Sequence, residues 1–123
     1  FRPVMVDRID DHVMHSEWYR VPDETVAAVE AAERVVAIGT TVVRSLESWK
    51  ATGEQSGRSS LFIRRPYAWK AVDVLLTNFH LPQSTLLCLV DGFVGPRWRT
   101  LYETAVAEDY RFLSFGDAML LER

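Results

Sequence analysis

The pattern of apolar and polar positions predicts strands and helices that follow one another along the chain. Short runs of β-branched and other apolar residues are typical of strands, and apolar residues repeated every three or four positions are typical of helices. The predicted strands are residues 1–6, 13–21, 34–39, 61–65, 71–76, 110–115 and 119–122. The predicted helices are residues 21–33, 42–53, 85–93 and 97–109, and residues 54–60 have the composition of a flexible loop.

Strands and helices alternate through the middle of the chain. This order predicts an α/β fold, with a layered α/β/α domain and a largely parallel or mixed sheet. Ser84 is expected to cap the helix that follows it, Gly53 to end the helix before it, and Gly95–Pro96 to break another. Gly116 and Asp117 predict a type II′ hairpin turn between the last two strands.

Size and charge limit the classes of function that the chain can have. Its 123 residues fit one domain, 1–123, and the net charge of −3 excludes a chain that is basic throughout. Any contact with RNA would therefore need a local basic patch or a part of the protein that is not present here. The candidate patch comprises Arg58, Arg64, Arg65 and Lys70, which are equally consistent with an ordinary solvated face.

Three features bear on where the protein acts. Cys88 is the single cysteine and is expected to be buried, and a chain that cannot form an internal disulfide agrees with a reducing cytoplasm. No apolar run approaches the length of a membrane-spanning helix, so a cytoplasmic protein without a membrane partner is expected. The sequence starts at Phe1 in a strand-like run, which indicates a piece of a longer protein.

The first candidate site follows the predicted strand at 34–39, where the sequence reads Gly39-Thr40-Thr41. In α/β sheets ligands bind beyond the carboxyl ends of strands. A glycine lets the backbone approach a ligand, and two hydroxyls at a helix start offer donors to an anionic or polar group. Arg44 lies one turn into that helix and can reach the same ligand. The alternative is a plain strand-to-helix connection in which Thr41 caps the helix.

The second candidate site is the cluster of His12, His15 and Glu17. On a strand, the two histidines face opposite ways, whereas His15 and Glu17 share a face. This spacing is poor for a metal, and the chain has no set of cysteine ligands, so a metal site is rejected. A histidine and a carboxylate on one face suit an oriented base, or else a satisfied surface pair.

The third candidate site is Thr77-Asn78-Phe79-His80-Leu81-Pro82, which follows the apolar strand predicted at 71–76. Asn78 can donate and accept hydrogen bonds, Phe79 offers a stacking face, and His80 can titrate near neutrality. The alternative is structural: His80 bonds to the backbone and Phe79 fills the core. The chemistry of the residues favours neither interpretation.

Four segments together resemble one protein family in order and spacing. They are "HVMHSEWY" (12–19), "VVAIGTTVVRSLES" (35–48), "VDVLLTNFHLPQSTLLCLV" (72–90) and "YRFLSFGDAML" (110–120). Over essentially its whole length the chain is similar to the C-terminal part of the S-adenosylmethionine:tRNA ribosyltransferase-isomerases of queuosine biosynthesis. Members of that family are considerably longer, so the chain is expected to be the closing portion of such a protein.

The resemblance implies a reaction and a fold. Members transfer and isomerise the ribosyl moiety of S-adenosylmethionine onto 7-aminomethyl-7-deazaguanine at the tRNA wobble position, which gives epoxyqueuosine and releases adenine and methionine. S-adenosylmethionine is the cosubstrate, and no metal is implied. The implied fold is an α/β domain into which a β-barrel domain is inserted. Only the end of the α/β domain is expected in this sequence. The remainder of the same polypeptide is expected to be its partner. The alternatives are a paralogue that acts on another acceptor and a non-catalytic fragment.

That reaction needs proton carriers. The sulfonium acidifies the adjacent 5′ carbon, so a base can remove a proton there, and the departing adenine needs a proton. The candidate catalytic residues are His80, His15 and Glu17, with Glu17 orienting His15 or holding a ribose hydroxyl.

The cosubstrate also needs binding groups for its carboxylate and its base. The candidate binding residues are Gly39, Thr40, Thr41, Arg44, Asn78 and Phe79. Hydroxyls and a guanidinium at a helix start suit a carboxylate or a tRNA phosphate, and an amide suits adenine or a base edge.

Overall fold

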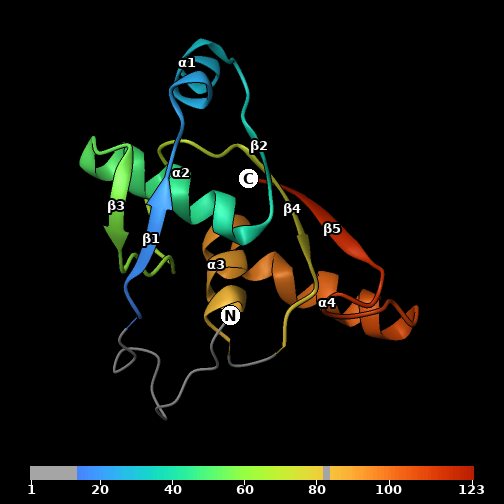
Figure 1. Ribbon diagram of the computed structural model, residues 1–123. Coiled ribbons are helices and arrows are strands. Elements are labelled where there is room, and N and C mark those ends of the chain that lie inside the picture. The colour runs from blue at the N-terminus through green and yellow to red at the C-terminus, as the bar shows by residue number, and fades with distance from the viewer. Residues whose placement is uncertain (1–13, 82–83) are drawn as a thin grey trace.

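The computed structural model describes residues 14–81 and 84–123 as two small sheets and a set of helices (Figure 1). The strands are β1 (Glu17–Arg20), β2 (Val36–Ile38), β3 (Ser56–Ser59), β4 (Val74–Asn78) and β5 (Ala118–Glu122). The helices are α1 (Asp23–Ala31), α2 (Thr40–Thr52), α3 (Thr85–Val94) and α4 (Trp98–Ala107), with a 3-10 turn, η2 (Gly95–Arg97), between the last two. The predicted strand at 1–6, His12 and Pro82 lie outside the described residues.

β4 is the central strand of a three-stranded sheet in which the strand order is β2-β4-β5. β2 runs parallel to β4, whereas β5 runs antiparallel to it. In this register Ile38, Leu76 and Leu120 form one row across the sheet. The prediction of a mixed sheet is confirmed, and the carboxyl ends of β2 and β4 meet at the same edge.

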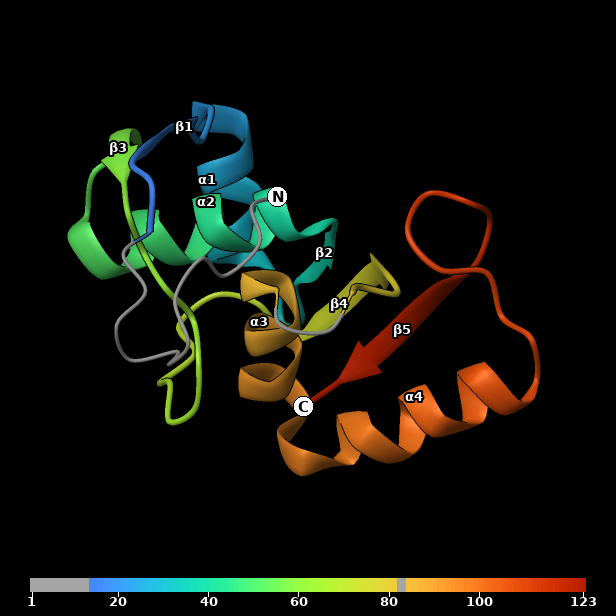
Figure 2. The ribbon, with the colours of Figure 1, turned by 90° about the horizontal axis from the view of Figure 1, so that it is seen from below.

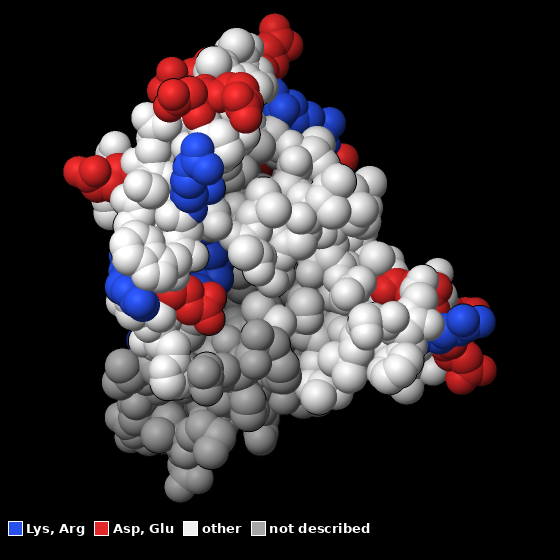
Figure 3. All heavy atoms as spheres, in the orientation of Figure 1, with Lys and Arg blue, Asp and Glu red and all other residues white. Residues whose placement is uncertain are grey.

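The helices that pack on this sheet cover one of its faces (Figure 2). The buried side chains of that face are Ala37, Leu75, Thr77, Met119 and Leu121. On the opposite face Val36, Ile38 and Leu120 are 54%, 68% and 65% exposed. The surface over β2, β4 and β5 is mostly uncharged (Figure 3). The predicted α/β/α layering is therefore incomplete in the described residues, which supply helices to a single face.

A second sheet pairs β1 with β3 in antiparallel register. The prediction of a flexible loop over 54–60 was wrong, because residues 56–59 are paired with β1. Tyr19 is buried beneath this ribbon, and its hydroxyl donates to the backbone carbonyl of Glu54 at 2.7 Å. Ser59 shares a 2.7 Å hydrogen bond with Ser48 of α2. Pairing and side-chain anchoring therefore order a segment that has the composition of a loop.

Two predicted strands do not form. Residues 61–65 belong to no strand, although Ile63 is buried in the core. Residues 110–115 contain a turn at 113–114 and no strand, and the amide of Leu113 donates to the carbonyl of Phe79 at 2.9 Å. The predicted hairpin at Gly116 and Asp117 was therefore wrong, since β5 pairs with β4 instead.

The predicted helix ends are confirmed. The Ser84 hydroxyl accepts the amide of Leu87 at 3.1 Å, which caps α3. Gly53 ends α2 with φ of 80°, a left-handed conformation that favours glycine. Gly95 follows the last residue of α3. Cys88 is half-buried rather than fully buried.

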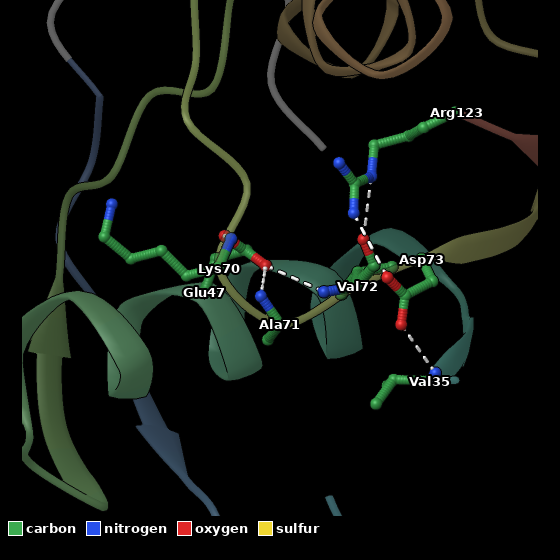
Figure 4. Close-up of polar contacts among 7 residues, drawn as sticks. All are labelled: Val35, Glu47, Lys70, Ala71, Val72, Asp73 and Arg123. Atoms are coloured by element: carbon green, nitrogen blue, oxygen red, sulfur yellow. Dashed lines mark hydrogen bonds and ion pairs between the residues drawn. The ribbon is translucent and has the colours of Figure 1, made fainter. Parts of the chain in front are cut away.

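Two carboxylates hold the segment that leads into β4 (Figure 4). Glu47 of α2 is fully buried, and its Oε1 accepts from the Tyr67 hydroxyl and the Lys70 amide, both at 2.9 Å. Its Oε2 accepts from the amides of Ala71 and Val72 at 2.7 and 3.0 Å. Burial is the main cause that raises the pKa of Tyr67, and the bond to Glu47 adds to it.

Asp73 is the second of these carboxylates. It accepts the Val35 amide at 2.8 Å and pairs with Arg123 at 3.2 Å, which ties the start of β2 to the end of β5 (Figure 4). The two carboxylates thereby fix where β4 begins, and so where its carboxyl end lies.

Candidate functional site

The candidate site lies where β2 and β4 end and α2 begins. Gly39 is the N-cap residue of α2, with φ of 94° and ψ of 149°, and no side chain caps the helix. The alternative that Thr41 is the cap is therefore wrong. The amide of Gly39 donates to the Leu76 carbonyl at 2.8 Å, which ties the helix start to the end of β4. Thr40 and Thr41 stand in the first turn of α2, at the positive end of its dipole.

A first cavity of about 190 Å³, the Arg44 pocket, lies on one side of this helix start. Its polar lining comprises His15, Glu17, Thr40, Thr41, Arg44 and Thr85, and its apolar lining is Met14, Leu61, Phe62, Ile63, Leu86 and Leu89. The structure therefore brings His15 and Glu17 of the second candidate cluster to the first cluster, which lies more than twenty residues away in the sequence.

Arg44 carries the main charge of this pocket. Its side chain is 18% exposed, and its Nη1 lies 3.4 Å from the Glu17 carboxylate. Its Nε is buried without a hydrogen-bond partner among the described residues. A buried donor without an acceptor is costly. The positive charge of the guanidinium that lines the pocket favours an anionic group beside it. Glu17 therefore pairs with Arg44, and its predicted role of orienting His15 or holding a ribose hydroxyl stays a prediction.

A second cavity of about 520 Å³, the His80 pocket, lies on the other side of the helix start. Its lining includes Ile38, Leu76, Asn78, His80, Leu81 and Leu113. Thr40, Thr41 and Leu86 line both pockets. The first and third candidate clusters thus meet in one site with two compartments, one charged and one largely apolar.

His80 is buried at the edge of its pocket. Its Nε2 shares a 2.9 Å hydrogen bond with the Thr77 hydroxyl, and its amide donates to the Tyr102 hydroxyl at 2.8 Å. Burial lowers the pKa of His80 from 6.5 to about 4. The imidazole is therefore neutral at pH 7, and it suits hydrogen bonding better than proton donation.

Phe79 does not reach either pocket. Its ring is 3% exposed and stacks on Phe112 at 5.1 Å, with Tyr102 and Tyr110 edge-on at 5.4 and 5.7 Å. The stacking face that the sequence offered to a ligand is occupied by these rings. Asn78, next to it, is exposed and lines the His80 pocket.

Some lining residues were not predicted. Thr85 follows the Ser84 cap and lines the Arg44 pocket, while Leu113 and Ser114 line the His80 pocket. All of them lie within segments that carried the family resemblance, which was the one available signal. The apolar run at 61–63 had been assigned to a strand and gave no sign of a site.

The described residues carry neither of two further features. Among residues 14–81 and 84–123, no three His, Cys, Asp or Glu side chains gather closely enough to hold a metal ion. Within the same ranges, none of the helices has the length and apolar character needed to cross a membrane.

Comparison with known proteins gives consistent relatives. The chain is 62% identical over 122 residues to the S-adenosylmethionine:tRNA ribosyltransferase-isomerase of Rubrobacter xylanophilus, covering 98% of this chain and 36% of that relative. It is 49% identical over 128 residues to the enzyme of the same name from Polynucleobacter necessarius, covering 100% of this chain and 37% of that relative. The chain thus spans little more than a third of the length of the curated relatives it matches.

A solved structure and a protein family agree with these relatives. The crystal structure of S-adenosylmethionine tRNA ribosyltransferase from Thermotoga maritima superposes with a TM-score of 0.79 at 50% identity, covering 84% of this chain and 39% of that one. The family described as queuosine biosynthesis protein matches residues 1–121. The chain therefore belongs to the queuosine biosynthesis protein family.

Proposed function

We propose that the whole protein is an S-adenosylmethionine-dependent tRNA ribosyltransferase-isomerase of queuosine biosynthesis. It transfers and isomerises the ribosyl moiety onto 7-aminomethyl-7-deazaguanine in tRNA, with release of adenine and methionine. The names of the curated relatives support this proposal. The described residues form the closing part of its α/β catalytic domain.

The observation that carries the proposal is the pairing of a charged pocket with an apolar one at a single helix start. S-adenosylmethionine has the same division, because its methionine end is charged and its adenine is not. Arg44, Thr40 and Thr41 line the Arg44 pocket and hold the carboxylate, with the guanidinium supplying the positive charge. Asn78 hydrogen-bonds the adenine in the His80 pocket.

The proton carriers divide in the same way. His15 is exposed at the mouth of the Arg44 pocket and is the better candidate for removing a proton beside the sulfonium. Glu17 lies in the same pocket and favours positive charge there. His80 is held neutral, and we assign it a hydrogen-bonding role toward the ligand.

The rest of the polypeptide completes this site. The exposed apolar side chains of Val36, Ile38 and Leu120 support this, because monomeric proteins rarely leave such a sheet face bare. We propose that another part of the whole protein packs on this face and closes the open side of the His80 pocket. The 123 residues by themselves are expected to be inactive.

Adenine release by the full-length protein tests the proposed function. The assay supplies S-adenosylmethionine with and without an anticodon stem-loop that carries 7-aminomethyl-7-deazaguanine. Release that depends on this base, with a matching mass gain on the RNA, is the expected result. A folded protein that binds S-adenosylmethionine yet leaves the stem-loop unchanged would point to another acceptor. A folded protein that binds neither S-adenosylmethionine nor the stem-loop would share only the fold of the family.

A further inference from the structure

A groove of about 870 Å³ lies on the opposite side of α3 from the Arg44 pocket. Its lining includes Arg64, Arg65, Tyr67, Asp91, Trp98 and Arg99, and we call it the arginine groove. We propose that the arginine groove binds the sugar-phosphate backbone of the RNA substrate beside the reactive base. This inference rests on the proposed function, and it assigns a docking surface to residues that the two pockets do not use.

The charge of the groove is opposite to that of the chain. The whole sequence has a net charge of −3, whereas the described residues that line the groove include three arginines and one carboxylate, that of Asp91. Arg64 has interactions of its own, so Arg65 and Arg99 are the two arginines assigned to phosphate. Arginine is the side chain best suited to phosphate, because its planar fork donates two parallel hydrogen bonds to two oxygens. A local cationic groove in an acidic protein matches a polyanion better than an apolar or cationic partner.

One carboxylate orients the two ends of the groove. Asp91 Oδ2 accepts the Nε of Arg65 at 2.8 Å, and its Oδ1 accepts the Nε1 of Trp98 at the same distance. The bond to Asp91 uses one of the five donors of the Arg65 guanidinium. Within the part of the chain that the structure describes, the other four have no hydrogen-bond acceptor. Asp91 thus holds the half-exposed guanidinium of Arg65 in place and leaves its other donors available to a phosphate.

Arg99 supplies the second cation at the start of α4. Its guanidinium lies 5.1 Å from the centre of the Trp98 ring, and the residue is exposed. Within residues 14–81 and 84–123, Arg99 has no partner for an ion pair or a hydrogen bond. An arginine beside an aromatic face is an arrangement that RNA sites use for phosphates and unstacked bases.

The segment that carries Arg64 and Arg65 is held rigidly against α3. A side chain at Gly92 would stand 3.4 Å from the backbone of Arg64, so glycine permits the close approach of segment and helix. Trp69 donates to the Gly92 carbonyl at 2.9 Å, and the Glu47 carboxylate fixes the residues beyond it. A groove that is ordered before binding loses little conformational entropy when RNA enters.

Helix α3 and the segment at 61–67 line both the Arg44 pocket and the arginine groove. Leu86 and Leu89 of α3 line the Arg44 pocket, whereas Leu87 and Cys88 line the groove. The segment likewise passes from the pocket at 61–63 to the groove at 64–67. A helix with its side chains is about 10–12 Å across, which corresponds to about three nucleotides at 3.4 Å per step. RNA with its reactive base in the site can therefore lay its neighbouring phosphates in the groove.

The test uses the full-length protein and the double variant Arg65→Gln with Arg99→Gln. Binding of the anticodon stem-loop that carries 7-aminomethyl-7-deazaguanine is followed by fluorescence anisotropy between low and moderate salt. Loss of two phosphate contacts is expected to weaken binding roughly tenfold and to reduce the slope of log K against log salt by about 1.5. Arg34→Gln is the matched control, because it removes an exposed arginine that lies before β2 and pairs with Glu122. It should leave the slope unchanged.

Two further measurements separate the possible failures. Arg65→Lys with Arg99→Lys keeps the charges, so it should retain the wild-type salt slope, whereas loss of the slope in this variant would contradict phosphate contact. S-adenosylmethionine affinity and melting temperature should stay near the wild-type values in all variants. If the glutamine variant binds the stem-loop as well as the wild type does, the groove does not bind RNA, whereas the proposed function is unaffected. Unchanged RNA binding overturns the groove even if the melting temperature falls, because the glutamine variant also loses the ion pair between Arg65 and Asp91. A folded wild type that binds no stem-loop removes both proposals.

Discussion

We predict that Glu47→Gln strongly destabilises the protein. The carboxylate of Glu47 is fully buried and accepts four hydrogen bonds, from Tyr67, Lys70, Ala71 and Val72. Each oxygen takes two of them. A glutamine amide replaces one oxygen by an NH₂ group, which donates and cannot accept. Whichever oxygen is replaced, two donors therefore lose their acceptor.

The size of the effect follows from this count. Each buried donor left without an acceptor costs about 1–3 kcal/mol, so the variant should lose about 2–6 kcal/mol of unfolding free energy. A typical domain has about 5–15 kcal/mol in total, so the loss is a large fraction of its stability. Urea denaturation of the full-length protein measures it, and the midpoint should fall by about 1–3 M at an ordinary slope.

Glu103→Gln is the matched control, because Glu103 is an exposed glutamate on α4. Its midpoint should stay near that of the wild type. If Glu47→Gln unfolds at the same urea concentration as the control, the four hydrogen bonds do not hold the segment before β4. The positions of β4 and of the candidate site would then need another physical cause.

Three further predictions concern the site itself. As pH falls from 6.5 to about 4, the unfolding free energy of the wild type should fall by about 3 kcal/mol relative to that of His80→Asn. The reason is that burial keeps the folded pKa of His80 below its unfolded value. Parallel pH–stability curves in urea would contradict this. Arg44→Gln should weaken S-adenosylmethionine binding about tenfold or more by calorimetry, whereas Arg34→Gln should not; equal affinities would exclude Arg44 from the carboxylate site. Gly39→Ala should cost about 1–3 kcal/mol from backbone strain, since φ is 94° while nothing lies within 4 Å of the added carbon. A thermal melt identical to that of the wild type would argue against this strain.

Features that depend on neighbouring residues could be predicted from the sequence. Ser84 caps α3 and Gly53 ends α2 because each effect involves a few adjacent backbone groups. The placement of both strand-end clusters at one edge also follows from local order, since β2 and β4 are each followed by a helix and run parallel. Two of the three candidate clusters could therefore be expected to meet.

Features that depend on distant residues could not be predicted in this way. The Ser56–Ser59 segment becomes a strand because β1 offers it a partner, which its own composition does not reveal. Residues 110–115 have the aromatic alternation of a strand, yet Tyr110 and Phe112 pack their rings around Phe79. Tertiary contacts decided both cases against local propensity.

The same contrast separates three adjacent residues of the site. Asn78, Phe79 and His80 are all able to bind a nucleoside, but the chain gives each a different environment. Phe79 is taken by the aromatic core, and Asn78 remains in the pocket. His80 is buried with the Thr77 hydroxyl as its partner, and among the described residues burial alone shifts its pKa. A histidine in a polar motif is therefore held neutral.

The charges of the site lie instead in the Arg44 pocket, where Arg44 faces Glu17 beside the exposed His15. Moving a charged group out of water is costly unless opposite charges receive it, whereas an uncharged base is favoured by an apolar wall. Under the proposed function, this difference sets the direction in which S-adenosylmethionine lies, with its charged methionine end toward Arg44 and Glu17 and its adenine toward His80. The bond between the sulfonium and the ribose would then lie at the start of α2, between the two compartments.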